Sequence, residues 1–255
     1  MKKIIKYLFL LTGGSFILAS CNDFLDREPL DSVTPDNFFF TENDLAAYAV
    51  KHYNFTTHEG FNAGIWRNDN ATDNQAATDY DKKWIPGQWK VPEAYDNPAS
   101  NDPWYFSAIR EANYFLETVV PRFEKGEIEG SETNIKHYIG EMYFLRAKNY
   151  LSKLETFGDF PIIKNTLPDE SASLIQASKR EDLDLAIGLL TNTISGGKNR
   201  ITKNAALLLK SRAALYEASW LTYHKGTALV PGGPGWPGKA EDIADFNIDT
   251  EIAFF

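Results

Sequence analysis

Cysteine and histidine are scarce in this sequence of 255 residues, which holds one cysteine, at position 21, and four histidines. A single cysteine excludes a disulfide within the chain and a zinc site built from several thiolates. The histidines, at positions 52, 58, 137 and 224, are scattered, and no His-Glu-x-x-His pattern occurs. The acidic stretch between residues 68 and 81 lacks the glycine of a calcium-binding EF-hand loop. We therefore expect no metal site.

The signatures of several enzyme classes are absent as well. No Gly-x-Ser-x-Gly nucleophile elbow occurs, and Lys239 is followed by alanine rather than by the serine or threonine of a phosphate-binding loop. A glycoside hydrolase needs two carboxylates about 5–10 Å apart. The sequence indicates no such pair, because the acids at 181, 182 and 184 are typical of a solvated first helical turn. We expect no catalytic residues and no cofactor.

The sequence also lacks an apolar run long enough to span a bilayer, which takes about 20 residues. The stretch from Leu8 to Leu18 is shorter and is interrupted by polar residues and glycines. Three lysines precede it and small residues follow it, so residues 1–20 are predicted to be a secretory signal peptide. Leu18-Ala19-Ser20-Cys21 resembles the bacterial lipobox, in which the cysteine sulfur is acylated before cleavage. Cys21 is therefore predicted to be a lipid anchor, and several acyl chains together hold a protein firmly to a membrane.

Positive charge is in short supply. The formal charge of the whole chain is −9, and removal of the leader would leave 23 basic against 35 acidic residues, a net charge of −12. Such a surface would repel a polyanion, so nucleic acid is excluded as a partner. Aromatic residues, by contrast, make up 14% of the sequence. This composition favours a neutral ligand that is recognised by flat ring faces.

Helical periodicity dominates the rest of the chain, so the sequence predicts an all-α fold after an extended tether at residues 21–41. Thr41 is a predicted N-cap with Asp44 at the N3 position of a capping box, and Leu45, Tyr48, Ala49 and His52 share one face of the helix that follows. Four further helices are expected at residues 103–121 (ended by Pro121), 132–157 (ended by Gly158), 180–194 (ended by Gly196-Gly197) and 202–220 (with Thr202 as N-cap).

The paired helices carry small residues and aromatics in places that resemble tetratricopeptide hairpins, although their spacing is too irregular for a strict repeat. Residues 54–103 interrupt them with a long stretch that has no period of 3.6 or 2 and is rich in asparagine, proline and tryptophan. Long ordered loops of this kind are commonly functional. The sequence therefore predicts one helical domain at 42–255 with a loop-rich insertion. The chain reaches Phe255 within another amphipathic segment, so we expect it to be truncated.

Several segments together resemble the SusD/RagB family of outer-membrane lipoproteins. They are Cys21-Asn22-Asp23-Phe24-Leu25-Asp26 with Pro29 and Phe38-Phe39-Phe40-Thr41, Trp104 to Asn113, Glu141-Met142-Tyr143-Phe144-Leu145-Arg146-Ala147-Lys148-Asn149-Tyr150 with Phe157-Gly158-Asp159-Phe160-Pro161, and Thr202 to Tyr216. The block from Glu141 to Pro161 is the strongest match, since it is similar to the family pattern E-x-x-F-L-R-A-x-x-Y followed by F-G-x-x-P.

This resemblance implies a tetratricopeptide-like helical protein that binds oligosaccharides at the cell surface and acts as a lid on a SusC-type TonB-dependent transporter. Asp23 and Asp26 are similar to the acidic signal after the cysteine that favours export to the outer face of the outer membrane. Family members are roughly twice as long as this chain, and the other half normally contributes much of the ligand-binding face.

The loop-rich insertion offers the chemistry that sugars require, since flat aromatics stack on apolar C–H faces and polar side chains bind hydroxyl groups. The candidate glycan-binding residues are Asp73, Asn74, Trp84, Trp89 and Tyr95. Thr72-Asp73-Asn74 is similar to a family loop near the glycan. Each tryptophan could instead fill the core of an irregular loop. Trp104, at the start of a helical stripe, is assigned to the core, and Arg146 is expected to pair with a nearby carboxylate or helix end.

Two other classes of function stay open from the sequence. A tetratricopeptide-like scaffold would hold a protein partner and no sugar, and titration with glycans would separate it from a glycan binder. A lipid-anchored glycoside hydrolase is less favoured, and an assay for release of reducing sugar would reveal it.

Overall fold

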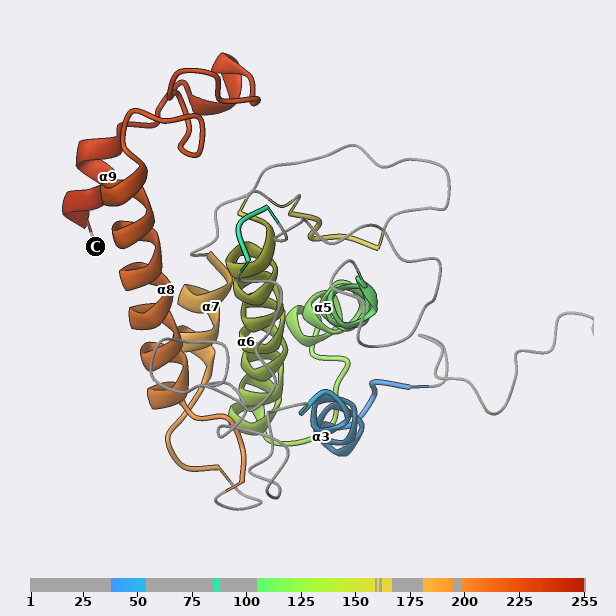
Figure 1. The fold of residues 1–255 in the computed structure, drawn as a ribbon. Helices are drawn as coiled ribbons and strands as arrows, with labels where there is room; N and C mark the ends of the chain where they lie inside the picture. Colours follow the sequence, from blue (N-terminus) through green and yellow to red (C-terminus); the bar gives the residue numbers. More distant parts are fainter. Residues whose placement is uncertain are drawn as a thin grey trace, which may run out of the picture. The chain divides into compact units, whose positions relative to one another are not determined.

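The computed structural model describes residues 38–53, 85–87, 105–158, 160, 162–166, 181–194 and 199–254, without the side chains of 240 and 242 (Figure 1). The chain divides into two compact units, Met1–Phe38 and Phe39–Phe255. Of the first unit only Phe38 is described, so the fold given below is that of the second. The predicted signal peptide at 1–20, the tether at 21–41 and the insertion at 54–103 lie wholly or almost wholly outside the described residues, and the boundaries of these segments stay predictions.

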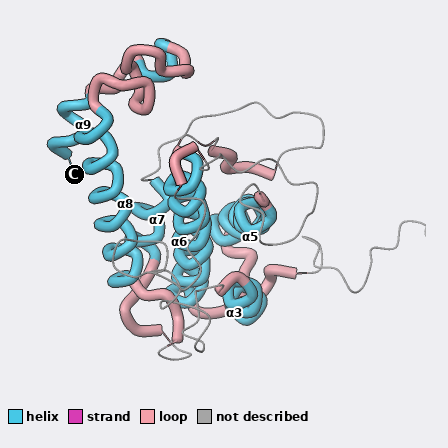
Figure 2. Tube along the Cα trace, in the orientation of Figure 1, coloured by secondary structure: helices cyan, strands magenta, loops and turns pink. Residues whose placement is uncertain are grey.

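Every regular element within the described residues is helical, as Figure 2 shows, which confirms the predicted all-α class. In chain order the elements are α3 (Glu42–Lys51), α5 (Ser107–Glu124), α6 (Glu132–Phe157), α7 (Glu181–Leu189), α8 (Lys203–His224), the short 3-10 helix η3 (Ala240–Ile243) and α9 (Ile248–Phe254). A single isolated bridge pairs Thr41 with Glu129 among these residues.

Helix α6 is the centre of the unit, because it packs against α3, α5, α7 and α8 (Figure 1). Its bounds and its stop at Gly158, which has φ of +78°, agree with the prediction. The predicted single inward stripe is too narrow, however. Tyr143, Tyr150 and Leu154 from that stripe are only half-buried, whereas residues all round the first half of the helix are buried. A helix with partners on several sides needs this pattern. Its buried apolar residues include Ile135, Tyr138, Ile139, Met142, Phe144, Leu145 and Ala147.

Helix α3 begins as predicted. The Thr41 hydroxyl accepts a hydrogen bond from the Asp44 N–H, and the Asp44 carboxylate accepts one from the Thr41 N–H, which completes the capping box. Leu45, Tyr48 and Ala49 are buried on its inner face. The Tyr48 ring stacks on Phe115 of α5 at a centroid distance of 5.4 Å.

Helix α5 differs from the prediction at both ends. It begins at Ser107, with Phe106 as N-cap, rather than at residue 103, and it continues through Pro121 to Glu124. Proline so near the end removes only one backbone hydrogen bond, and the last turn has other support. The Arg122 guanidinium lies 4.2 Å from the centroid of the Phe40 ring, and the Lys125 N–H donates to the Pro121 carbonyl.

Helix α7 is shorter than predicted, because it ends at Leu189 rather than at residue 194. The Thr191 N–H donates to His137 Nδ1 of α6 at 3.2 Å, and the Thr191 hydroxyl donates to the Thr193 carbonyl. The Thr191 carbonyl in turn accepts from the Lys203 N–H. These contacts draw the backbone at Thr191 away from a helical path.

Helix α8 starts after the predicted N-cap, since the Thr202 hydroxyl accepts a hydrogen bond from the Ala205 N–H. It runs four residues beyond the predicted end at Trp220. The Trp220 ring lies between Tyr216 and His224, its neighbours one turn before and after, with centroid distances of 6.2 and 4.2 Å. Ring contacts at this spacing stabilise the added turn.

The N-terminus of α6 is held by a side chain from α3. Ser131, the N-cap of α6, makes no side-chain capping bond, and its N–H donates instead to Glu42 Oε2 at 2.6 Å. Asn134 Nδ2 donates to the same oxygen at 3.3 Å. The Glu42 carboxylate therefore supplies the negative charge that a helix N-terminus favours.

Replacement of Glu42 by glutamine tests this arrangement. We expect Glu42→Gln to lower the free energy of unfolding by about 1 kcal/mol, because the N-terminus of α6 loses its charged acceptor. Urea unfolding followed by circular dichroism measures the change. The control is Glu132→Gln, which removes an exposed carboxylate from the first turn of α6. A loss for Glu42→Gln no larger than that of the control would contradict the capping role.

Candidate functional site

The predicted glycan-binding residues Asp73, Asn74, Trp84, Trp89 and Tyr95 lie outside the described residues, as do Cys21 and Trp104. Their roles stay predictions. What the structure describes is the helical frame at both ends of the 54–104 segment. Tyr53 precedes the segment directly after α3, and Tyr105 and Phe106 follow it directly before α5.

Glu141 holds the frame at the Tyr53 end. Its carboxylate is fully buried at the middle of α6, and the Tyr53 hydroxyl donates to Oε1 at 2.6 Å. Arg200, just before α8, donates from Nε to the same oxygen at 2.9 Å and from Nη2 to Oε2. The Ile201 N–H donates to the Tyr53 hydroxyl oxygen at 3.0 Å. One carboxylate thus joins the chain after α3 to the chain before α8.

The electrostatics of this cluster are balanced. Burial raises the pKa of Tyr53, and the negative charge of Glu141 raises it further, so the phenol stays protonated and can donate. Burial acts to lower the pKa of Arg200, but the hydrogen bonds and charge of Glu141 outweigh it, and the pKa is raised overall. A buried carboxylate with a bidentate arginine and a phenol is therefore paired and hydrogen-bonded, as a buried charge requires.

His137 borders the same carboxylate. Its Nδ1 accepts from the Thr191 N–H, so the ring hydrogen of a neutral imidazole is on Nε2. Nε2 lies 3.2 Å from Glu141 Oε1, yet it is not aligned for a hydrogen bond. The contact is therefore electrostatic, and His137 mainly joins α6 to the chain after α7.

A second buried cluster is built on Arg146 of α6, which pairs with a carboxylate as expected from the sequence. Arg146 Nε donates to Asp182 Oδ2 at 2.7 Å and Nη2 to Oδ1 at 2.6 Å. Its Nη1 donates to Asn113 Oδ1 of α5 at 2.8 Å and to the Lys164 carbonyl at 3.2 Å. Asn113 in turn donates to the carbonyls of Ile163 and Asn165. The cluster joins α5, α6 and α7 to the extended segment after α6.

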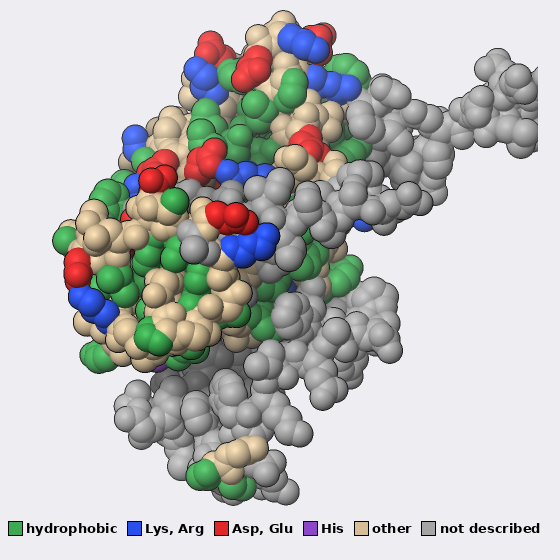
Figure 3. Space-filling model, turned by 90° about the horizontal axis from the view of Figure 1, so that it is seen from above, with side chains coloured by type: hydrophobic (Ala, Val, Ile, Leu, Met, Phe, Trp, Pro, Cys, Tyr) green, Lys and Arg blue, Asp and Glu red, His purple; other side chains and the backbone are tan. Residues whose placement is uncertain are grey.

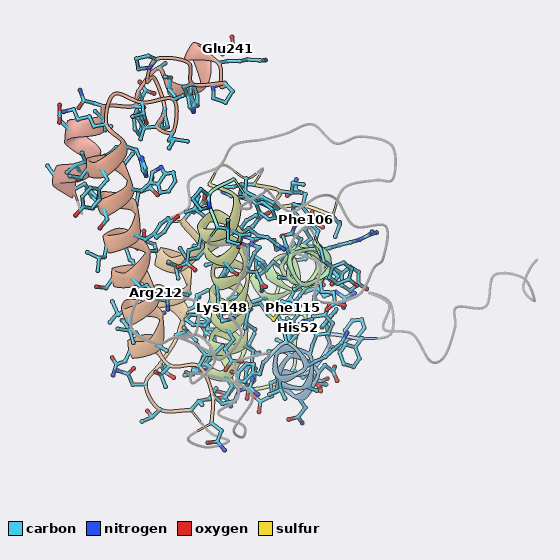
Figure 4. The ribbon with its side chains drawn as sticks, viewed as in Figure 1. His52, Phe106, Phe115, Lys148, Arg212 and Glu241 are labelled. Carbon is cyan, nitrogen blue, oxygen red and sulfur yellow. The ribbon has the colours of Figure 1, made fainter. Side chains whose placement is uncertain are left out.

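An aromatic stack lies at the other end of the 54–104 segment. The Phe106 and Phe160 rings are 5.0 Å apart and the Phe160 and Phe157 rings 5.4 Å apart, each pair at 18° (Figure 4). Phe106 begins α5 and Phe157 ends α6, so the stack fixes the entry of one helix against the exit of the other. The sequence analysis did not find this stack, although Phe-Gly-x-Phe at the helix stop is a signal of it.

The chemistry of these clusters is that of support. In both buried clusters the charges are neutralised by partners within the fold, which leaves no free base or nucleophile there. Within the described ranges no group of three histidine, cysteine, aspartate or glutamate side chains could hold a metal ion. No helix in the same ranges is both long and apolar enough to cross a bilayer. On the face drawn in Figure 3, acidic and basic side chains lie beside one another with hydrophobic ones between them.

Comparison with known proteins identifies the family. Residues 23–215 match a family model for SusD-like proteins, described as starch-binding and associating with the outer membrane. The chain belongs to the SusD-like family. Proteins of this family are generally non-catalytic binding proteins.

Two relatives agree with this assignment. The chain is 26% identical over 225 residues to the SusD-like protein P38 of Formosa agariphila, which covers 83% of the chain and 42% of that protein. It also superposes on the crystal structure of a SusD-like protein from Bacteroides fragilis with a TM-score of 0.56 and 24% identity, over 76% of the chain and 38% of that structure. The second comparison supports the fold. The chain spans about two-fifths of the length of each relative.

The Arg146–Asp182 pair can be tested against a neighbouring acid in α7. Asp182→Asn leaves the buried guanidinium without its anion, so we expect the free energy of unfolding to fall by about 3–5 kcal/mol. The control Asp184→Asn breaks the exposed pair with Lys210, and we expect a loss below about 1 kcal/mol. Thermal and urea unfolding measure both. Similar losses in the two variants would show that the buried pair has no special role.

Proposed function

We propose that this protein is a cell-surface lipoprotein that captures oligosaccharides and delivers them to a SusC-type TonB-dependent transporter. The observation that carries the proposal is the SusD-like match over residues 23–215, whose description names starch binding and the outer membrane. The all-helical frame, similar to that of a solved SusD-like structure, supports it. The chain covers 42% of its relative P38, so the relative's whole activity is transferred here only as a proposal.

The 54–104 segment is the proposed binding region. It contains Trp84, Trp89 and Tyr95, whose rings can stack on the apolar faces of sugars, and Asp73 and Asn74, which can bind hydroxyl groups. The helical frame supports this role because its two clusters hold the chain at both ends of the segment. Tyr53 is tied to Glu141 at one end, and Phe106 is stacked on Phe160 at the other.

The proposed location is the outer face of the outer membrane, with the chain attached through lipid on Cys21. The basic leader, the short apolar run and Leu-Ala-Ser before Cys21 support acylation, and Asp23 and Asp26 support export to the surface. A surface lipoprotein of this kind would sit beside the transporter that it supplies.

Calorimetric titration with a panel of oligosaccharides tests the binding function, beginning with maltooligosaccharides because the family description names starch. We expect Trp84→Ala and Trp89→Ala each to weaken binding roughly 3- to 10-fold, which corresponds to the loss of about 0.5–1.5 kcal/mol of ring contact. The control is Tyr223→Ala, which removes an exposed aromatic side chain from α8. Unchanged affinity in both tryptophan variants would reject the proposed site. Failure of the unmodified protein to bind any glycan in the panel would reject the function.

Acylation is tested separately by Cys21→Ala. We expect the unmodified protein to incorporate labelled palmitate and to partition into detergent, and we expect the variant to lose both properties, because the chain then has no thiol to acylate. Phase separation in detergent measures the partition. Full membrane attachment of the Cys21→Ala variant would show that the lipid is not the anchor.

A further inference from the structure

The outward side of α8 exposes leucines. Leu208 is 72% exposed, Leu215 70% and Leu207 47%, whereas Ala206 and Leu221 on the opposite side are buried. Among the described elements α8 contacts α6, α7 and α9 (Figure 1). None of these contacts covers the leucines at 208 and 215. The sequence had placed both residues on one side of this helix, and that side faces outward.

The composition of this outward face is unusual for a solvated helix. At 100° per residue, the charged residues Lys203, Lys210 and Glu217 fall on the inner half of α8, and Arg212 is the one charged residue of the helix on the outer half. The rest of the outer half is apolar, small or uncharged, namely Asn204, Ala205, Leu207, Leu208, Ser211, Ala214, Leu215, Tyr216, Ala218, Ser219, Thr222 and Tyr223. A helix that lacks a charged side is typical of one that is covered on both sides.

The spacing of the face suits another helix. Leu208 and Leu215 are seven residues apart, so they form one ridge, and Ser211 and Ala218 beside them are small enough to admit a partner's side chains. Arg212 adds a charge at the middle of the ridge. Its one ion pair in the structure is with Glu155 at 3.3 Å, and its side chain is 70% exposed, so it can also meet a carboxylate from outside.

A second copy of this chain is a poor occupant. Two α8 helices that paired antiparallel around a two-fold axis, with Leu208 of one against Leu215 of the other, would place Ser211 and Arg212 at the axis. Each Arg212 would then lie near its own copy, and like charges at such a contact repel. A helix of different sequence, with an apolar ridge and an acid opposite Arg212, fits better.

The relatives provide a source for such a helix. P38 and the Bacteroides fragilis structure each have more than half of their length outside the part that this chain covers. We propose that the outward face of α8 is the packing surface for a helix from that further part of a SusD-like chain. The helix carries an apolar ridge at heptad spacing and a carboxylate that pairs with Arg212. This inference rests on family membership and does not depend on glycan binding.

Cysteine accessibility tests whether the face is covered, because the chain has only Cys21 as a natural thiol and the unmodified protein gives the background. The variant is Leu215→Cys, and the matched control is Lys239→Cys, at a side chain that is 77% exposed in the segment between α8 and η3. Both are labelled with a polyethylene glycol maleimide, first as the purified 255-residue chain and then in membranes of lysed cells that produce the protein from its own gene.

In the purified chain we expect both cysteines to be labelled at the same rate. In the membranes we expect Leu215→Cys to be labelled at least tenfold more slowly than Lys239→Cys, because a helix covers the position. Equal rates in the membranes would overturn the proposal. Denaturation before labelling gives the total thiol and excludes a difference in protein amount.

A photocrosslinking amino acid at Leu208 identifies the occupant in the same membranes. We expect mass spectrometry to find the crosslinked peptide in a SusD-like polypeptide, within an amphipathic helix that carries an acidic residue. A crosslinked dimer of this 255-residue chain would show that a second copy covers α8. A crosslink to a transporter or to another outer-membrane protein would show that α8 is a docking face for that protein. Either of these two results would overturn the proposal.

Discussion

The buried carboxylate of Glu141 is the constraint on which the rest of the frame depends. A charge at the middle of α6, away from water, is tolerated only if partners surround it. Tyr53 and Arg200 are those partners, and they are 147 positions apart in the sequence. The need to neutralise one carboxylate therefore brings the end of α3 and the start of α8 to the same point on α6.

Arg146 imposes the complementary constraint one and a half turns further along the same helix. There the buried charge is positive, and Asp182 of α7 neutralises it while Asn113 of α5 completes its hydrogen bonds. The two clusters hold every helix that packs on α6. They also hold the backbone next to the 54–104 segment, in which the proposed glycan-binding side chains lie. The chemistry of the frame is thus structural, and recognition is assigned to the segment that it supports.

Much of the helical frame could be predicted from local sequence, because its signals are local. Thr41 with Asp44 predicted the start of α3, Gly158 the end of α6, and Thr202 the start of α8. The errors have tertiary causes. Pro121 lies within α5 where Arg122 packs on Phe40, α7 ends early where Thr191 bonds to His137, and Leu208 of α8 faces outward. The pairing of Glu141 with Tyr53 and Arg200 could not be read from the sequence, since no local pattern joins residues so far apart. For the candidate site, only the region and the residue types could be proposed, because no periodic pattern orients side chains in residues 54–103.

A double-mutant cycle between Glu141 and Arg200 tests most directly whether this buried pair holds the frame. The free energy of unfolding in urea would be measured for the unmodified protein, Glu141→Gln, Arg200→Gln and the double variant. Each single variant leaves a buried charge without its partner and should lose about 3–5 kcal/mol, whereas the double variant should lose far less than the sum of the two. Losses that add within about 0.5 kcal/mol would contradict the central role of the pair.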